Sequence, residues 1–270
     1  MKKKSKRKPR FTAATADKHT LYQLSVQDVT TEESFLSRNF KKLRKRDALD
    51  LREDFCGTAL MCGEWVKHHP KRRSTGVDID AKVLKWGREH NIAPLGDDAR
   101  RVTLLQQDVR APTRGRHDLV LAFNFSYWIF RTRDEMRDYF ERVRASLKSD
   151  GVFFLDAYGG WEAVEPMVEA RPIRGGFTYE WDQDKFDPIT HAVENHIHFE
   201  FKDGTRLDKA FSYHWRFWTL PELQELLREA GFRDVVVYWD TSDDEATDDF
   251  RPRRRAENQP GWLAYLAALR

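Results

Sequence analysis

The stretch that decides the fold is Ala48-Leu-Asp-Leu-Arg-Glu-Asp-Phe-Cys-Gly-Thr-Ala-Leu-Met61. It begins with the pattern of a short apolar strand, continues as an acidic turn around Gly57, and ends with the start of an amphipathic helix. In a doubly wound sheet, such a junction of strand, turn and helix is where a nucleotide-like ligand meets backbone N–H groups. The stretch therefore predicts an α/β fold with a ligand site close to Gly57.

Strand and helix patterns alternate along the rest of the chain. Two of the helix patterns open with a capping box, at Thr132 with Glu135 and at Thr219 with Glu222. The alternation predicts a doubly wound, mostly parallel sheet with helices on both faces. The expected strands are 48–53, 74–78, 102–107, 118–123, 151–157 and 235–239, and the expected helices are 58–69, 81–90 and those that start at Thr132 and Thr219.

A segment after the fifth strand departs from this alternation. Residues 193–201 and 207–218 read as strands, and Asp203-Gly204 between them is a hairpin turn signal. We therefore expect an antiparallel, β-rich insertion at 160–218. The domain prediction is a disordered basic tail at 1–16 followed by one domain at 17–270 that includes this insertion.

The charge of the chain is unevenly distributed. The formal net charge is +3, but residues 2–10 hold seven of the 47 basic side chains and no acid, so the remainder carries 40 basic against 44 acidic groups. Such a tail can bind nucleic acid, although a solvated tail is the preferred interpretation. The acidic cluster Asp243–Asp249 beside Arg251–Arg255 reads as a polar surface loop.

Composition also bounds the location. No run of about 18 apolar residues exists, so no membrane span is expected. The two cysteines, Cys56 and Cys62, fit neither a redox pair nor a zinc site. Reduced thiols in a cytoplasmic protein are the expectation.

Four residues stand at the ends of successive expected strands: Gly57, Asp78, Asp108 and Asn124. Asp78 lies 21 residues after Gly57, close to the spacing of about 20 residues at which an acid binds a ribose. An acid at a strand end can also cap the next helix, and this is the alternative for Asp80. Because parallel strands end at one edge of a sheet, the four residues predict one site for a nucleoside-containing ligand.

The segment from Glu53 to Ala59 resembles the cofactor loop of class I S-adenosylmethionine (SAM) methyltransferases. The usual loop reads acidic-x-Gly-x-Gly-x-Gly, and here only the middle glycine is kept, with Phe55 and Ala59 in the outer positions. The resemblance covers most of 48–160 and, more loosely, 216–269. It implies SAM as cofactor, Asp108 near the adenine, and Asn124 at the site of methyl transfer. It also implies a seventh, antiparallel strand at 262–269, although the leucine and alanine content of that segment favours a helix.

The cofactor-binding residues that the resemblance implies follow the same strand ends, together with an amino-terminal lid at Tyr22. Arg52 is expected to meet the cofactor carboxylate or, as an equal alternative, to form a structural salt bridge with Glu53, Asp54 or another acid. The implied set is Tyr22, Arg52, Glu53, Phe55, Gly57, Thr58, Ala59, Asp78, Ile79, Asp108, Val109 and Asn124.

The acceptor side is expected to be aromatic and water-excluding, although many of these side chains can instead pack the insertion. Asn124 and Tyr127 give the outline of the Asn-Pro-Pro-Tyr motif of amino-group methyltransferases without its prolines. Tyr127 and Tyr158 are the catalytic candidates, and the substrate-binding candidates are Trp128, Tyr158, Trp161, Arg216 and Trp218.

No metal site is predicted. His196 and His198 share one face of an expected strand. Because the sequence offers them no clear third ligand, a solvated hairpin face is preferred.

These patterns favour a SAM-dependent methyltransferase that acts on an oxygen or nitrogen of a small molecule. An NAD-dependent dehydrogenase would need a fuller Gly-x-Gly-x-x-Gly fingerprint and a proton relay, and the sequence contains neither. Two alternatives stay open: a methyltransferase directed to nucleic acid or ribosomes by the basic tail, and a non-catalytic protein that keeps the fold.

Overall fold

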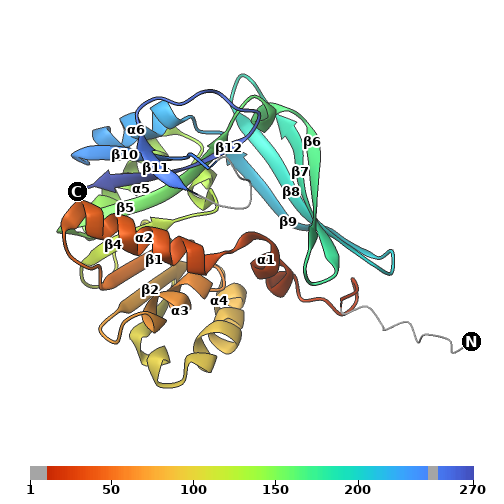
Figure 1. Ribbon diagram of the computed structural model, residues 1–270, viewed down its shortest axis with the longest axis horizontal. Coiled ribbons are helices and arrows are strands. Elements are labelled where there is room, and N and C mark those ends of the chain that lie inside the picture. The colour runs from red at the N-terminus through yellow and green to blue at the C-terminus, as the bar shows by residue number, and fades with distance from the viewer. Residues whose placement is uncertain (1–10, 243–248) are drawn as a thin grey trace, which may run out of the picture. The chain divides into compact units, whose positions relative to one another are not determined.

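The computed structural model describes residues 11–242 and 249–270 (Figure 1). The described chain forms two compact units. The larger unit comprises residues 29–163 and 217–270, and the smaller unit comprises residues 11–28 and 164–216 within the described part. The single domain expected at 17–270 is thus divided, and the expected insertion at 160–218 supplies most of the smaller unit.

The larger unit is built on one mixed sheet of eight strands. Its strands are β1 (Asp50–Asp54), β2 (Arg73–Asp78), β3 (Val102–Gln106), β4 (His117–Ala122), β5 (Leu147–Gly159), β10 (Asp234–Asp240), β11 (Phe250–Arg253) and β12 (Trp262–Leu269). Their order is β11-β10-β12-β5-β4-β1-β2-β3. β1 to β5 run parallel, and β12 is antiparallel to both β5 and β10, as the resemblance implied.

β11 is the eighth strand, which the expected seven did not include. It pairs antiparallel with β10, so the part of the expected surface loop around Arg251 belongs to a sheet edge. Asp243–Asp248 of that expected loop lie outside the described residues.

Helices cover both faces of this sheet, which confirms the doubly wound prediction. The main ones are α2 (Val29–Arg44), α3 (Leu60–Lys67), α4 (Ala81–Gly87), α5 (Arg133–Ser146) and α6 (Leu220–Glu229). On one face, Phe35 of α2 and Trp65 of α3 pack against Leu121 and Phe154 of the sheet. On the other face, Phe140 of α5 packs on Phe153, which points away from Phe154.

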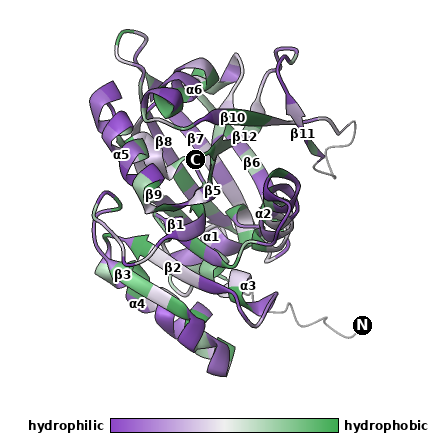
Figure 2. Cartoon of the chain, turned by 90° about the vertical axis from the view of Figure 1, so that its left-hand side faces the viewer, coloured by the Kyte–Doolittle hydropathy of each residue, from purple (hydrophilic) through white to green (hydrophobic). Residues whose placement is uncertain are grey.

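The helix boundaries follow from local chemistry. Both expected capping boxes are present: Thr132 exchanges hydrogen bonds with Glu135 before α5, and Thr219 does so with Glu222 before α6. The outer surface of α5 is largely hydrophilic, whereas hydrophobic stretches lie in the strands of the sheet (Figure 2). Among the described residues, no helix has the length and apolar character needed to cross a membrane.

The smaller unit is an antiparallel sheet covered by a helix. Its strands, in the order β6-β7-β8-β9, are β6 (Met167–Ile173), β7 (Phe177–Phe186), β8 (Ala192–Phe201) and β9 (Arg206–Arg216), and its helix is α1 (Lys18–Val26). The expected hairpin turn is confirmed, since Gly204 has a φ of 82° between β8 and β9. Leu21 of α1 packs in a core with Phe177 and Phe199.

Part of the expected tail belongs to this smaller unit. Residues 1–10 lie outside the described residues, but Phe11 packs edge-on against Phe177, with ring centroids 5.7 Å apart. The backbone N–H of Ala13 donates to the Thr205 hydroxyl at 3.0 Å. The boundary expected after residue 16 is therefore wrong, because residues 11–16 are packed on the sheet.

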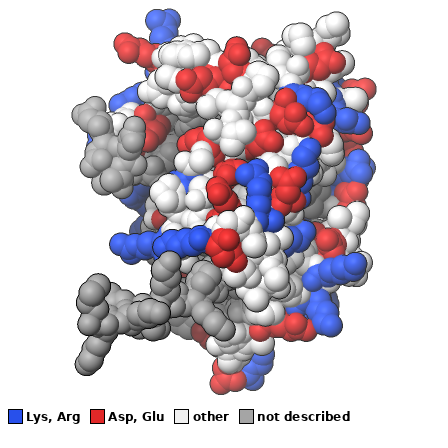
Figure 3. Space-filling view, turned by 90° about the vertical axis from the view of Figure 1, so that its right-hand side faces the viewer, with Lys and Arg blue, Asp and Glu red and all other residues white. Residues whose placement is uncertain are grey.

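One face of the smaller sheet carries a polar network that includes both expected histidines. His196 and His198 are 2% and 3% exposed, so the solvated face expected for them is wrong. His198 bonds Asp208 at 2.6 Å and Asp182 at 3.1 Å through its two ring nitrogens. On the face of the molecule in Figure 3, acidic and basic side chains are likewise interspersed.

Candidate active site

The loop between β1 and α3 has an unusual backbone. Phe55, Gly57 and Ala59 all adopt left-handed conformations, with φ of 55°, 51° and 55°. A left-handed conformation costs an L-residue about 1–2 kcal/mol, which is why glycine is usual there. The loop therefore has glycine-type geometry at Phe55 and Ala59, the two positions where the related loops carry glycine.

The side chains at the two outer positions turn away from the open side of this loop. The Phe55 ring packs against Phe130 and Tyr139, with centroids 6.1 and 5.8 Å away. Ala59 is fully buried. A Cβ built at Gly57 would meet no atom within 4 Å, so the open space of the loop lies at Gly57.

The loop is tied to the end of β2. The Gly57 N–H donates to Asp78 Oδ2 at 2.8 Å, and the Asp80 N–H donates to Asp78 Oδ1 at 2.9 Å. Burial raises the pKa of the Asp78 carboxyl from its usual value. Asp80 caps α4 by accepting from the Lys82 N–H at 2.8 Å, which confirms the alternative considered for it. The side chain of Ile79 is 71% exposed between these two acids.

Asp108 follows β3 and is held by its own neighbour. Arg110 donates from Nη2 to Asp108 Oδ2 at 2.7 Å and from Nε to Oδ1 at 3.0 Å. These bonds lower the pKa of the Asp108 carboxyl, so it is ionised at neutral pH. The next residue, Val109, is buried, and its carbonyl accepts from Arg52.

Arg52 is a structural residue, which corrects its expected contact with a cofactor carboxylate. The side chain is 1% exposed. Its Nε donates to Asp54 Oδ1 at 2.6 Å, its Nη2 to the Val109 carbonyl, and its Nη1 to the Thr113 hydroxyl at 3.3 Å. All three guanidinium nitrogens are engaged, so the salt-bridge alternative is the one that the structure has.

Glu53 and Thr58 support the loop from the inside. Glu53 Oε2 accepts from the Cys62 N–H at 3.1 Å, and burial raises the pKa of this carboxyl to about 7. The Thr58 carbonyl accepts from the Asn91 amide at 2.8 Å. Both residues are buried, and they hold the turn that presents Gly57.

A second strained turn follows β4. Asn124 and Phe125 have φ of 57° and 56°. Their backbone N–H groups donate to the two carboxylate oxygens of Asp156, at 2.7 and 3.0 Å. Burial raises the pKa of Asp156 to about 7. The sequence analysis missed Asp156, although a lone acid within the apolar strand 152–157 is a signal that could have found it.

Aromatic rings lie beside this turn. Tyr158 stacks on Trp128, with centroids 4.8 Å apart and an interplanar angle of 24°, and lies 4.7 Å from Phe125. Phe217 packs edge-on against both Trp128 and Tyr158. We call Phe125, Trp128, Tyr158 and Phe217 the aromatic cluster.

Other acceptor-side candidates have separate places. The Tyr127 hydroxyl donates to the Asp156 carbonyl at 2.6 Å, and burial raises the pKa of Tyr127 well above its usual value, which opposes a role as a base. Trp218 is fully buried, with its indole N–H bonded to the Phe130 carbonyl at 3.1 Å. Trp161 is 51% exposed in the larger unit.

Two of the expected site residues belong to the smaller unit. Tyr22 packs on Phe211, with centroids 5.1 Å apart, and Arg216 ends β9. Their roles as lid and substrate contact remain predictions.

The smaller unit also holds one group of potential metal ligands. Ligand atoms of Asp184, Glu194 and His196 lie within 4.8 Å of one another. The Lys209 ammonium is 3.1 Å from His196 Nε2 and 3.8 Å from Asp184, so a side-chain cation already lies in this group.

Known proteins share part of the sequence pattern and the fold of this chain. A family model described as a methyltransferase domain matches residues 56–153. No curated protein matches the chain by sequence.

Solved structures share the fold at low identity. A SAM-dependent methyltransferase from Clostridium acetobutylicum ATCC 824 is 19% identical, with a TM-score of 0.69 over 93% of this chain and 96% of that chain. A SAM-bound amino pentose methyltransferase from Micromonospora echinaspora is 15% identical, with a TM-score of 0.67 over 93% and 95%. A sugar N-methyltransferase from Streptoalloteichus sp ATCC 53650 is 16% identical, with a TM-score of 0.62 over 98% and 97%.

The matched family model covers the loop at Gly57, the ends of β2 to β4 and most of β5, and the solved structures share the surrounding fold. Residues 56–153 are thus similar to a methyltransferase domain, and the chain shares the fold of SAM-dependent methyltransferases.

Proposed function

We propose that this enzyme transfers a methyl group from SAM to an oxygen or nitrogen atom of a small molecule. The observation that carries the proposal is the open loop at Gly57, tied by a hydrogen bond to Asp78, with Asp108 after β3 on one side of β1 and Asn124 after β4 on the other. Similar solved structures include an amino pentose methyltransferase, a sugar N-methyltransferase and a glycopeptide N-methyltransferase, which supports a small acceptor.

The residues at the strand ends fit the parts of SAM. The open backbone at Gly57 leaves room for close approach of the ligand, and the partly exposed Asp78 carboxylate can accept hydrogen bonds from ribose hydroxyls. Ile79 offers exposed apolar surface for the adenine, and the ionised Asp108 offers an acceptor for its amino group. When bound, SAM would supply a methyl group on a positively charged sulfur, which leaves as a neutral thioether when an oxygen or nitrogen nucleophile takes the methyl group.

The acceptor would lie at the turn after β4. Asp156 fixes this turn by accepting two backbone N–H groups, and the aromatic cluster provides an apolar wall next to it. Methyl transfer gains mainly from alignment of the reacting atoms in a pocket that excludes water. Tyr158, which is partly exposed on this wall, remains the candidate for contacting the acceptor or its proton.

The location is part of the same proposal. Cys56 and Cys62 are buried free thiols, the state that cytosolic reductants maintain. We therefore place the enzyme in the cytoplasm.

The test is a calorimetric titration with SAM and with its demethylated product. We expect Asp78→Ala to weaken binding at least tenfold, on the scale of one or two hydrogen bonds to a charged group. Asp80→Asn is the matched control. Because Asp80 caps α4, this substitution should leave the affinity for SAM unchanged. Wild-type affinity in Asp78→Ala would overturn the ribose assignment, and no binding at millimolar ligand would overturn the proposed function.

A further inference from the structure

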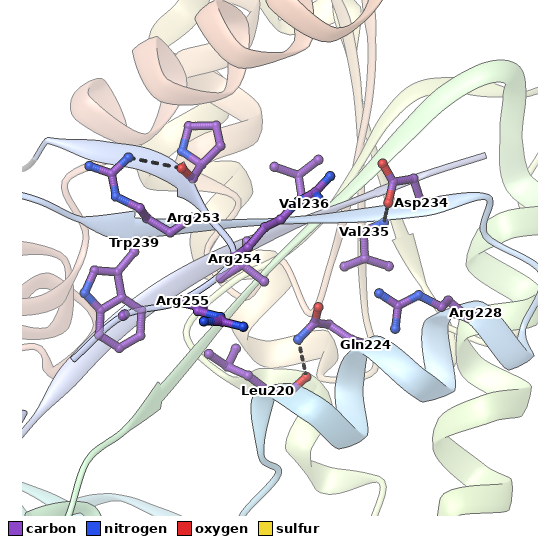
Figure 4. Close-up of a pocket in the computed structure, with 13 residues that line it drawn as sticks. Leu220, Gln224, Arg228, Asp234, Val235, Val236, Trp239, Arg253, Arg254 and Arg255 are labelled. Carbon is purple, nitrogen blue, oxygen red and sulfur yellow. Dashed lines mark hydrogen bonds between the residues drawn. The ribbon is translucent and has the colours of Figure 1, made fainter. Parts of the chain in front are cut away.

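A cavity of about 620 Å³ lies at the opposite end of the larger sheet from β1, β2 and β3. It is lined by residues of α6, β10, β11 and the segment that follows β11 (Figure 4). Its size is within the range of about 300–1,000 Å³ that is usual for small-molecule pockets. The strand order places β12, β5 and β4 between it and β1, so this cavity is separate from the proposed cofactor site.

The cavity is strongly cationic. Among the residues that the structure describes, four arginines line it, Arg228, Arg253, Arg254 and Arg255, against one acid, Asp234. Asp234 Oδ1 already accepts the Val235 N–H at 2.8 Å. We call this cavity the arginine groove.

Within residues 11–242 and 249–270, none of these four arginines forms a salt bridge with a carboxylate, whereas the neighbouring Arg251 pairs with Asp249 at 2.6 Å. Unpaired guanidinium groups around one cavity repel each other and attract an anion.

The arrangement suits a phosphate group. In Figure 4 the guanidinium groups of Arg228 and Arg255 point toward the Gln224 amide from opposite sides. That amide is fixed, because its Nε2 donates to the Leu220 carbonyl at 3.1 Å. Guanidinium groups bind phosphate oxygens in a bidentate geometry, and two or three of them around one space are typical of a phosphate site.

The other wall of the arginine groove is apolar and aromatic. Val235, Val237 and Trp239 of β10 line it. The Trp239 ring lies 5.1 Å from that of Trp262, which braces it from the neighbouring strand β12. An indole surface beside arginines is what a nucleobase needs for stacking while its phosphate is neutralised.

An acidic peptide added to the edge strand fits this groove less well. Pro252 lies in the middle of β11 and removes a backbone donor that an added strand would need. The arginines of this edge also oppose strand pairing, as exposed charges commonly do.

We propose that the arginine groove binds a nucleoside phosphate, with the phosphate at Arg228, Arg254 and Arg255 and the base against Trp239. The nucleoside phosphate can be a free nucleotide or one unit of a single-stranded nucleic acid. The inference does not depend on the proposed function, because the groove shares no residue with the cofactor loop.

The experiment titrates the full chain with uridine diphosphate, in the presence of saturating S-adenosylhomocysteine so that the proposed cofactor site cannot contribute. We expect saturable binding that the double variant Arg254→Gln/Arg255→Gln weakens at least tenfold, as expected for the loss of charge-assisted hydrogen bonds. Arg251→Gln is the matched control, because Arg251 lies on β11, a few residues before Arg254, but outside the groove.

Three further probes sharpen the result. Trp239→Leu should weaken the binding of uridine diphosphate more than Trp239→Phe does. Neither variant should change the affinity for inorganic phosphate. An oligouridylate that binds more tightly than uridine diphosphate, with a salt dependence that decreases as arginines are removed, identifies a nucleic-acid strand. Equal affinity for both identifies a free nucleotide.

The opposite results are equally definite. The proposal is overturned if the double variant binds as the wild type does, or if Arg251→Gln weakens binding equally. Inorganic phosphate that binds as tightly as uridine diphosphate would exclude a role for the base. An acidic peptide that binds more tightly than the nucleotide would assign the groove to a protein partner.

Discussion

The two ends of the larger sheet differ in charge and in how that charge is held. At the β1–β3 end, the acids accept hydrogen bonds from groups of the protein. Asp54 accepts from Arg52, Asp78 from the Gly57 N–H, and Asp108 from Arg110. At the β10–β11 end, the four groove arginines form no salt bridge within the described residues. The three acids are therefore held in place by the protein itself before any ligand binds. The groove arginines have no such carboxylate partner, so a bound anion would neutralise their charge.

The buried pair of Arg52 and Asp54 should give the largest effect. Arg52→Met leaves the Asp54 carboxylate buried without its partner, and we expect the free energy of unfolding to fall by about 3–5 kcal/mol. Urea denaturation measures this change. The control is Arg110→Met beside the partly exposed Asp108, for which we expect a loss below about 1 kcal/mol. Equal losses would remove the distinction between buried and exposed acids.

Asp156 should make stability depend on pH. Its carboxyl has a pKa of about 7 in the folded chain, above its usual value of 3.8. From about pH 4 to pH 7 the unfolded chain therefore binds fewer protons than the folded chain, so stability falls as pH rises, by about 4 kcal/mol at most for this group.

Urea denaturation between pH 4.5 and pH 8 measures this dependence. Asp156→Asn cannot titrate, so its stability should fall less steeply over this range than that of the wild type. Glu53, whose pKa is also about 7, adds to the slope in both proteins and cancels in the difference. Parallel pH profiles for the two proteins would show that Asp156 titrates normally.

The loop around Gly57 offers a smaller and more selective change. Gly57→Ala adds a methyl group to a residue with a φ of 51°, at the open side of the loop, so we expect a loss of about 1 kcal/mol in stability and weaker SAM binding. Ala59→Gly relieves similar strain at a buried position, so we expect a gain of up to about 1 kcal/mol with binding unchanged. Thermal unfolding and SAM titration measure both. If SAM binding were weaker in Ala59→Gly but unchanged in Gly57→Ala, the ligand would not lie at Gly57.

Deleting residues 1–10 should have the smallest effect. These residues carry seven basic side chains in the sequence but lie outside the described part of the chain. If the acceptor is a small molecule, we expect kcat/KM and its salt dependence to stay unchanged. A steep loss of activity or of salt dependence would favour a nucleic-acid acceptor instead.

The sequence predicted the elements whose signals are local. The capping boxes at Thr132 and Thr219, the turn at Gly204 and the strands before Gly57 and Asp78 each depend on neighbouring residues. The parallel sheet follows from these signals, because alternating strands and helices have few ways to pack.

Features that depend on distant partners were predicted only in part or not at all. The sequence left Arg52 between a cofactor contact and a salt bridge, because its contacts with Val109 and Thr113 are more than 50 positions away in the chain. The burial of His196 depends on β7 and β9 on either side, and β11 becomes a strand only because β10 pairs with it. Sequence spacing cannot report such contacts, since they exist only after the chain has folded.

The position of β12 has a consequence for synthesis on the ribosome. Residues 262–269 form the strand between β5 and β10, so the segments made before them cannot close the sheet. Until that strand emerges, β5 presents an open edge and the β10–β11 hairpin has no neighbour, the condition in which nascent chains associate with one another. A released chain that lacks residues 262–269 should therefore be bound by chaperones.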